Sequence, residues 1–334
     1  RSAASPALIA LGVSVAVLAV LFVVNPYALG YGSHLVSIFE FANSLWKADN
    51  ADWQHCYIVP FAVGAMVYFK RNELHVSELR PAQTGLWITV FGMFVYVLGF
   101  RADNVYLGYA SFQILTGGLL LWFCGWKWFS KLIYAWAFLV FLYPVPFLDA
   151  VAFPLRMLMS QASVTVLNVI GVDAVKVGTA ILSAPDQMAG LKTGDRFSVD
   201  VADPCSGIRS LFALMMVSAL YGYFTQPGVW RKIVIFLLSA PLAVMGNLAR
   251  ILMLTIGTIV MGPETAIGTL EDPSFFHMLA GYLVFIVALG GLLGIGSLLN
   301  LDWRSVISRI KSSMGPSGSA GTPATQPRGV QDEY

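Results

Sequence analysis

The sequence predicts an all-α polytopic membrane protein of about eight transmembrane helices, with a small extracytoplasmic β-hairpin before the sixth helix. Of the 334 residues, 57% are hydrophobic and only 11% are charged, whereas a soluble domain averages about 45–50% apolar and about 25% charged residues. Several apolar runs approach the length of about 20 residues that a helix needs to cross a bilayer. The net charge of +2 gives no indication of a nucleic-acid partner.

Eight apolar segments account for the predicted helices. Two of them, 56–69 and 132–146, are short for a span, and prolines lie within or beside several segments, where they kink or end a helix. Pro241 leaves open whether residues 232–262 form one kinked span or a partly re-entrant one. The segments are 6–24, 56–69, 84–100, 105–125, 132–146, 207–224, 232–252 and 276–299.

Positive charges gather on alternate connections between these segments. One set of connections and flanks holds ten lysines and arginines, whereas the other short connections hold only Lys47 and Arg101. Because cytoplasmic loops carry an excess of Lys and Arg, the first set and both termini are predicted to be cytoplasmic. The ten are Lys70, Arg71, Arg80, Lys127, Lys131, Arg231, Lys232, Arg304, Arg309 and Lys311.

The largest segment on the other, extracytoplasmic face covers residues 147–206. Residues 151–170 mix apolar and small polar side chains, which indicates a helix that lies in the membrane interface or packs on the bundle. Residues 175–182 and 196–203 are rich in β-branched side chains, which favours two strands joined by a polar loop. This β element leads directly into a cysteine, Cys205.

The domain organisation follows from these patterns. We expect one integral membrane domain over residues 1–312, with residues 171–204 as its extracytoplasmic β element. Residues 313–334 are rich in Gly, Ser, Pro and Thr, and this composition predicts a disordered cytoplasmic tail.

The stretch DPCSGIRSL, residues 203–211, places Cys205 at the start of the sixth helix. Asp203 suits the N-cap and Pro204 suits the first helical position. Cys205 then lies in the first turn, where free N–H groups and the helix dipole favour a thiolate. Arg209 follows one turn later on the same face. The setting suits a nucleophile, and the alternative is a small buried hydrophobe of a membrane helix.

Two further reactive side chains are predicted at the same membrane depth. The seventh segment starts at a cytoplasmic basic pair and reaches the outer face about 16–20 residues later, where Asn247 and Arg250 fall. His277 lies at the outer end of the eighth segment, and His55 at the outer end of the second. Taken singly, Arg250 is explained by snorkelling and His277 by an interfacial hydrogen bond, but their convergence with Cys205 favours a site.

These residue types suit acyl transfer. A thiolate attacks a carbonyl, a histidine moves the proton, and an arginine stabilises the negative charge that develops. Asn247 is a further hydrogen-bond donor one turn from Arg250. We expect no metal and no cofactor, because the four histidines are at least 20 residues apart and no HExxH, CxxC or phosphate-binding loop occurs.

Three separated motifs in this order resemble the exosortase/archaeosortase family, of the exosortase type. They are Cys205-Ser206-Gly207-Ile208-Arg209, Asn247-Leu248-Ala249-Arg250, and His277 followed by Gly281-Tyr282. Residues 53–71 and 141–161 are similar to the amino-terminal and central segments of the family. The likeness covers about residues 50–300.

The resemblance implies a polytopic cysteine transpeptidase of the bacterial cytoplasmic (inner) membrane. Its substrates would be exported proteins with a C-terminal sorting signal, which consists of a Pro-Glu-Pro-like motif, a transmembrane helix and a basic cluster. Cleavage would pass through a thioacyl-enzyme, and the acyl group would go to an unknown acceptor. The protein would also contact membrane lipids.

The same resemblance implies the roles of the site residues. Cys205 would be the nucleophile, His277 the general acid and base, and Arg250 the stabiliser of the oxyanion. The supporting or substrate-binding residues would be Asn247, Arg209, Ser206, Gly207 and His55.

The sequence departs from the family pattern at three positions, and two rival functions stay open. Ile208 replaces the usual Leu, and Pro204 directly precedes the cysteine. Cys56 follows His55, which puts a second thiol near the site. Arg209 could tune the thiolate, hold an acidic substrate motif or anchor the helix at the interface. A simple hydrolytic protease is one rival. A transporter or lipid-handling scaffold is the other; it would show an inverted repeat, and none is visible in the sequence.

Overall fold

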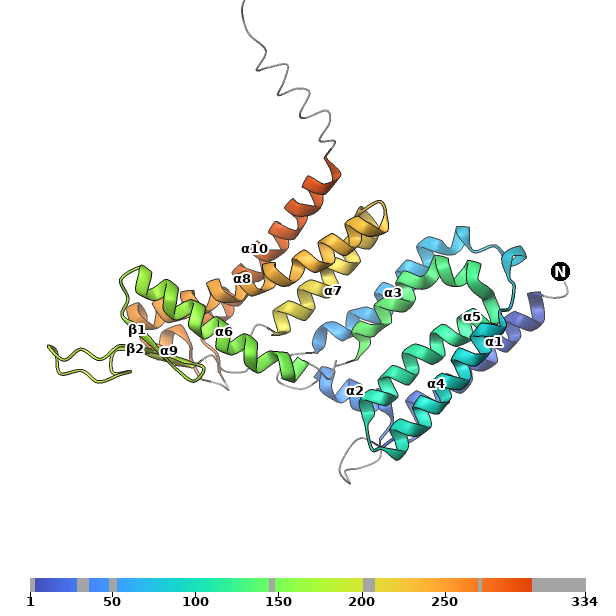
Figure 1. Cartoon of the computed structure of the whole chain (residues 1–334), viewed down its shortest axis with the longest axis horizontal. Helices are drawn as coiled ribbons and strands as arrows, with labels where there is room; N and C mark the ends of the chain where they lie inside the picture. Colours follow the sequence, from blue (N-terminus) through green and yellow to red (C-terminus); the bar gives the residue numbers. More distant parts are fainter. Residues whose placement is uncertain are drawn as a thin grey trace, which may run out of the picture.

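A computed structural model describes residues 4–28, 36–47, 53–143, 148–200, 208–269 and 272–301. Helices dominate these residues, and the described elements include one small antiparallel sheet. Figure 1 shows the helices in two groups that follow one another along the chain. The first group contains α1 (Ala4–Ala19), α2 (Ile38–Lys47), α3 (Ile58–Lys70), α4 (Gln83–Arg101) and α5 (Val105–Phe138), and the second contains α6 (Leu148–Val169), α7 (Ile208–Thr225), α8 (Val229–Met261), α9 (Pro263–Ala266) and α10 (Phe275–Asn300).

The first group packs around a buried aromatic core. α1 continues as a π-helical turn at Val20–Val24, which carries the buried Phe22. Phe22 and Tyr27 both contact the ring of Tyr96 on α4, with ring centroids 5.3 and 4.9 Å apart. The Tyr27 hydroxyl donates a hydrogen bond of 2.8 Å to the Tyr96 carbonyl. The start of the chain is thereby held against α4.

α2 was not predicted, since it lies in a stretch that the hydropathy pattern treats as a loop. Its buried residues Ile38, Ala42 and Trp46 recur every four positions, which places them on one face of a helix. The predicted loop 25–55 therefore contains an amphipathic helix that packs on the aromatic core.

α5 consists of two helices that meet at Gly125, where φ is 80° and ψ is 179°. The Gln113 side chain donates to the Trp136 carbonyl at 2.7 Å, and the Trp136 indole donates to the Gln113 carbonyl at 2.9 Å. The chain therefore turns back at Gly125, and these helices correspond to the predicted segments 105–125 and 132–146. The second ends in a 3₁₀ turn at Leu139–Leu142, and residues 144–146 lie outside the described residues.

Four of the described helices are long and apolar enough to cross a membrane. They are α4, α8, α10 and the continuous run Val105–Leu142, which includes the turn at Gly125. Two shorter apolar helices, Ile9–Val24 and Leu211–Thr225, match further predicted segments. The structure confirms a mostly helical chain with candidate membrane-spanning helices. The number of about eight spans, the orientation and the domain limits stay predictions, and the tail 313–334 lies outside the described residues.

The β element has three strands, so the prediction of two strands was wrong in number. The strands β1 (Ala174–Val177), β2 (Ala180–Ser183) and β3 (Ser198–Asp200) pair in that order, with Val177 opposite Ala180 and Ile181 opposite Val199. The predicted strand 175–182 is itself a hairpin, because Gly178 adopts a φ of 63° that suits a two-residue turn. Residues 201–203 lie outside the described residues.

α8 runs as one helix through Pro241 over 33 residues, so the described chain does not break at this proline. At 1.5 Å per residue this helix is about 50 Å long, whereas the hydrocarbon core of a bilayer is about 30 Å thick. Its last turns pack beneath α6 and the sheet: Ile251 and Leu254 share a buried cluster with Leu167, Ile181 and Phe197. α6 and the sheet thus form a cap on the end of α8 and the start of α10 (Figure 1).

Replacing Gly125 by Ala is expected to lower the free energy of unfolding by more than about 2 kcal/mol. A Cβ at this position would lie 1.9 Å from the Arg80 carbonyl oxygen, and φ of 80° is unfavourable for any residue with a side chain. Unfolding in mixed micelles measures the change. Gly64→Ala on α3 is the control, because a Cβ there meets nothing within 4 Å. Equal stability of the two variants would contradict this account of the turn.

Candidate active site

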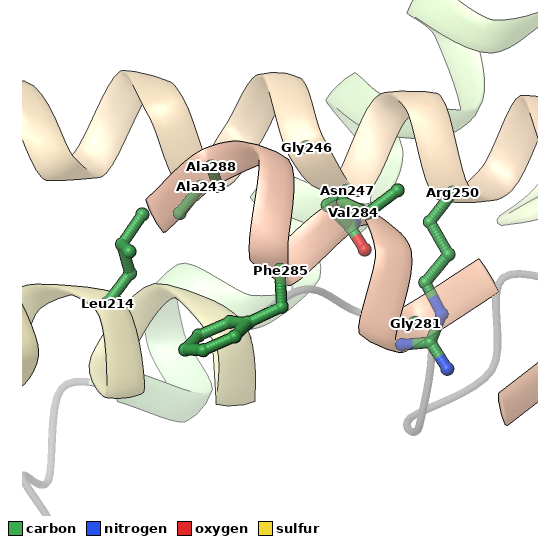
Figure 2. Close-up of a pocket in the computed structure, with 9 residues that line it drawn as sticks. All are labelled: Leu214, Ala243, Gly246, Asn247, Arg250, Gly281, Val284, Phe285 and Ala288. Carbon is green, nitrogen blue, oxygen red and sulfur yellow. The ribbon is translucent and has the colours of Figure 1, made fainter. Parts of the chain in front are cut away.

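Asn247 and Arg250 lie one turn apart on α8 and face the first turns of α10 (Figure 2). The Arg250 guanidinium passes directly over Gly281: a Cβ built at Gly281 would lie 3.5 Å from Arg250 Cζ. A methyl group at this position would make an ordinary van der Waals contact with the guanidinium. The Arg250 side chain therefore lies against α10 at Gly281.

His277 is positioned by the first turn of α10. The Ser274 hydroxyl caps this helix, since it accepts a hydrogen bond of 3.1 Å from the His277 backbone N–H. The same hydroxyl donates to the Ala266 carbonyl at 2.9 Å, and the Ser274 N–H donates to the Ile267 carbonyl at 3.0 Å. The connection between α9 and α10 is thus tied to the helix start, which fixes the position of His277.

Arg250 of α8 and His277 of α10 lie near the same end of these two helices, close enough for the charge of Arg250 to influence the His277 imidazole. Gly281, which Arg250 contacts, lies one helical turn after His277. Two complementary groups, a guanidinium and an imidazole, therefore share one end of the α8–α10 pair.

Asn247 is buried, with 4% of its surface exposed. Neither its Nδ2 nor its Oδ1 has a hydrogen-bond partner within the described part of the chain. It borders a cavity of about 30 Å³ that lies among α7, α8 and α10, and that Arg250 and Gly281 also line (Figure 2). A water molecule needs about 10–15 Å³ and polar partners. The cavity therefore has the size and the polar group to take one small polar molecule.

His55 lies in a 3₁₀ turn at Gln54–Tyr57, directly before α3. The neighbouring Trp53 ring lies 5.9 Å from the His55 ring and 6.0 Å from the ring of Phe212 on α7. The turn that carries His55 therefore contacts the early turns of α7, the helix that follows Cys205 in the sequence. Burial lowers the pKa of His55 to about 4, so its imidazole is neutral at pH 7.

The remaining predicted residues are described in part or not at all. Cys205, Ser206 and Gly207 lie outside the described residues, so their predicted roles stay predictions. Arg209 belongs to the first turn of α7, but its side chain also lies outside the described set. Cys56, the predicted second thiol, is fully buried in the aromatic core.

Several residues of this region were not predicted. Leu214, Val284 and Phe285 close the cavity beside Asn247, and no pattern in the sequence marks them, because apolar residues fill every helix here. Ser274 was detectable, since a serine before an apolar run is a common helix start. Within the described residues no three His, Cys, Asp or Glu lie together as a metal site requires.

The chain belongs to the transmembrane exosortase family, whose sequence pattern matches residues 46–294. This range includes the sequence positions of Cys205, Asn247, Arg250 and His277. No curated protein and no solved structure matches the chain. Membership of this family supports a role as a membrane transpeptidase or protease.

The burial of His55 predicts a loss of stability in acid. The folded protein binds a proton at His55 only near pH 4, whereas the unfolded chain binds it near the ordinary value of 6.5. Stability should therefore fall as pH decreases from about 6.5 towards 4, with a loss of about 2 kcal/mol between pH 7 and pH 5.

Unfolding at the two pH values measures this loss in the wild type and in His55→Gln, which should lack it. His75→Gln is the control, because His75 is exposed. A wild type and a His55→Gln variant with the same pH dependence would disprove the interpretation.

Proposed function

We propose that this exosortase is a membrane-embedded cysteine transpeptidase that removes the C-terminal sorting signal of exported proteins. The observation that carries the proposal is the convergence of Arg250, His277 and Asn247 at one end of the α8–α10 pair. Leu214 of α7 borders the same cavity as Asn247, and α7 begins three residues after Cys205. The helix that follows the predicted nucleophile thus packs against the helices that carry its partners.

The reaction proceeds in two halves. The Cys205 thiolate attacks the carbonyl carbon of the scissile peptide bond, and Arg250 donates hydrogen bonds to the oxyanion that forms. The C–N bond then breaks, and the leaving amine takes a proton from His277. In the second half the acceptor loses its proton to His277, attacks the thioester carbonyl and releases the thiolate.

The height of Arg250 along α8 supports a site at the membrane surface. Arg250 follows Arg231 by 19 positions, which corresponds to about 28 Å of helix. This matches the thickness of about 30 Å of the hydrocarbon core, so the two arginines reach opposite faces. With Arg231 in the cytoplasm, Arg250 is at the extracytoplasmic face of the bacterial inner membrane, where exported substrates arrive.

The proposed substrate carries a Pro-Glu-Pro-like motif, a transmembrane helix and a basic cluster. A guanidinium forms strong paired hydrogen bonds with a carboxylate, so Arg209 or Arg250 suits the glutamate of the motif. The substrate helix would pack against the bundle within the bilayer. Transfer to a non-water acceptor distinguishes this enzyme from a hydrolytic protease, whose product would end in a free carboxylate.

Co-expression with a tagged sorting-signal protein tests the chemistry. Cys205→Ala is expected to abolish processing, and His277→Ala and Arg250→Ala to slow it at least about 100-fold. Cys124→Ala is the matched control, because this thiol is buried in α5 and should not affect processing.

Mass spectrometry of the new terminus identifies the acceptor. Normal processing by folded Cys205→Ala protein would rule out the thioacyl route, whereas a free carboxylate on the wild-type product would support hydrolysis in place of transfer.

Asn247→Leu is expected to separate stability from activity. A buried amide without partners costs about 1–3 kcal/mol, so the folded protein should be as stable as the wild type or more stable. Processing should nevertheless fall at least about tenfold, because in this proposal the Asn247 amide forms a hydrogen bond with a polar group of the reaction. Thermal unfolding and processing are measured together. A variant that loses stability, or that processes normally, would contradict a functional role for Asn247.

A further inference from the structure

A second, larger cavity lies in the first helix group, between α1, α3 and the two helices of α5. Its volume is about 280 Å³. Twelve residues line it, and eleven of them are apolar, among them Leu18, Val63, Val67, Leu132, Ala135 and Trp136. None of its lining residues belongs to the candidate active site.

The polar groups of the lining already have hydrogen-bond partners, so the cavity offers water little to bind. The one hydroxyl-bearing residue is Thr116, whose Oγ1 donates to the Phe112 carbonyl of its own helix at 2.8 Å. The Trp136 indole N–H is likewise used, by the Gln113 carbonyl. An apolar cavity of about 150 Å³ stays dry and takes up hydrocarbon. This groove is larger, and it is open to the surroundings of membrane-embedded helices, so acyl chains are the hydrocarbon available to fill it.

Basic residues follow or precede lining residues of the groove in the sequence. Lys131 precedes the lining residue Leu132, and Lys70 follows the lining residue Val67 by less than one turn. Lys131 donates to the Glu73 carbonyl at 2.6 Å and forms an ion pair with the Glu78 carboxylate. The loop between α3 and α4 is therefore held against the turn inside α5, near Gly125.

Cations outnumber carboxylates in this region. The two carboxylates are engaged by lysines, Glu73 by Lys70 at 2.7 Å and Glu78 by Lys131. The hydrogen bond from Lys131, together with the charges of Lys131 and Lys127, holds the pKa of Glu78 below its ordinary value. The cations are Lys70, Arg71, Arg80, Lys127 and Lys131, and of these Arg71, Arg80 and Lys127 are exposed.

We propose that this groove is a binding site for one anionic phospholipid. One acyl chain lies along α1, α3 and α5, and the phosphate of the head group lies next to Arg71 and Lys127. Basic clusters at the end of transmembrane helices attract anionic head groups in this way. The site is independent of the proposed catalytic function.

Native mass spectrometry of the purified full-length chain tests the proposal. The probe is an equimolar mixture of dioleoylphosphatidylglycerol and dioleoylphosphatidylcholine. We expect one tightly held phosphatidylglycerol per chain, and a reduction of about tenfold or more in Val67→Trp, whose indole would occupy the groove. Leu237→Trp is the matched control, because Leu237 is an exposed apolar residue of α8 outside the groove.

A double variant, Arg71→Gln with Lys127→Gln, tests the head group. It should lose the preference for phosphatidylglycerol while the bound phosphatidylcholine is unchanged, and free glycerol phosphate should not displace the lipid. Equal binding of the two lipids by the wild type would overturn the assignment of the head group. Unchanged binding in folded Val67→Trp would overturn the groove itself.

Two further outcomes point to another occupant. Loss of substrate processing in Val67→Trp, with lipid binding intact, would assign the groove to a transmembrane segment of the substrate. A dimer that dissociates in Val67→Trp would assign it to a second copy of the chain. Ala135→Phe repeats the test from α5 if Val67→Trp does not fold.

Discussion

The antiparallel packing of α8 against α10 is the contact on which the described site depends. Within a bilayer, apolar burial gives helices little reason to associate, so close contact and small residues decide which helices pair. Gly281 provides that close contact where the Arg250 side chain crosses α10. Ser274 caps the same helix and joins it to the connection that follows α8. The guanidinium, the imidazole and the buried amide of Asn247 take their relative positions from this one pair.

Much of this arrangement was predictable from the sequence, because hydropathy and rare polar residues carry strong signals in a membrane protein. Arg250 and His277 stand out as ionisable groups near the ends of apolar runs. Counting helix turns from Arg231 places Arg250 at the depth predicted for His277. The helices α4, α7 and α10 lie where their apolar runs predict. The gap predicted between segments 105–125 and 132–146 begins directly after the observed turn at Gly125.

Other features followed from contacts that no local pattern shows. The amphipathic α2 lacks the length of a span, and its register is visible only once Ile38 and Trp46 are known to be buried. The hairpin of β1 and β2 depends on a turn at Gly178. This turn is not evident from the sequence, because the β-branched residues around it suggest one continuous strand. The cavity beside Asn247 lies where three helices meet in space, and their lining residues are far apart in the sequence. Cys205 was predicted from its motif alone, and its chemistry rests on the processing experiment.

The length of α8 has a geometric consequence for the reaction. The helix is longer than the bilayer is thick, and its projecting end is held by the cap of α6 and the sheet. The cap packs on α8 and α10 together, so this buried cluster fixes the distance along α8 between Arg250 and the cap. In the proposed orientation, that distance would set how far from the membrane Arg250 acts. A substrate anchored by its own helix would then be selected by how far its scissile bond stands from the membrane, as well as by the residues around that bond.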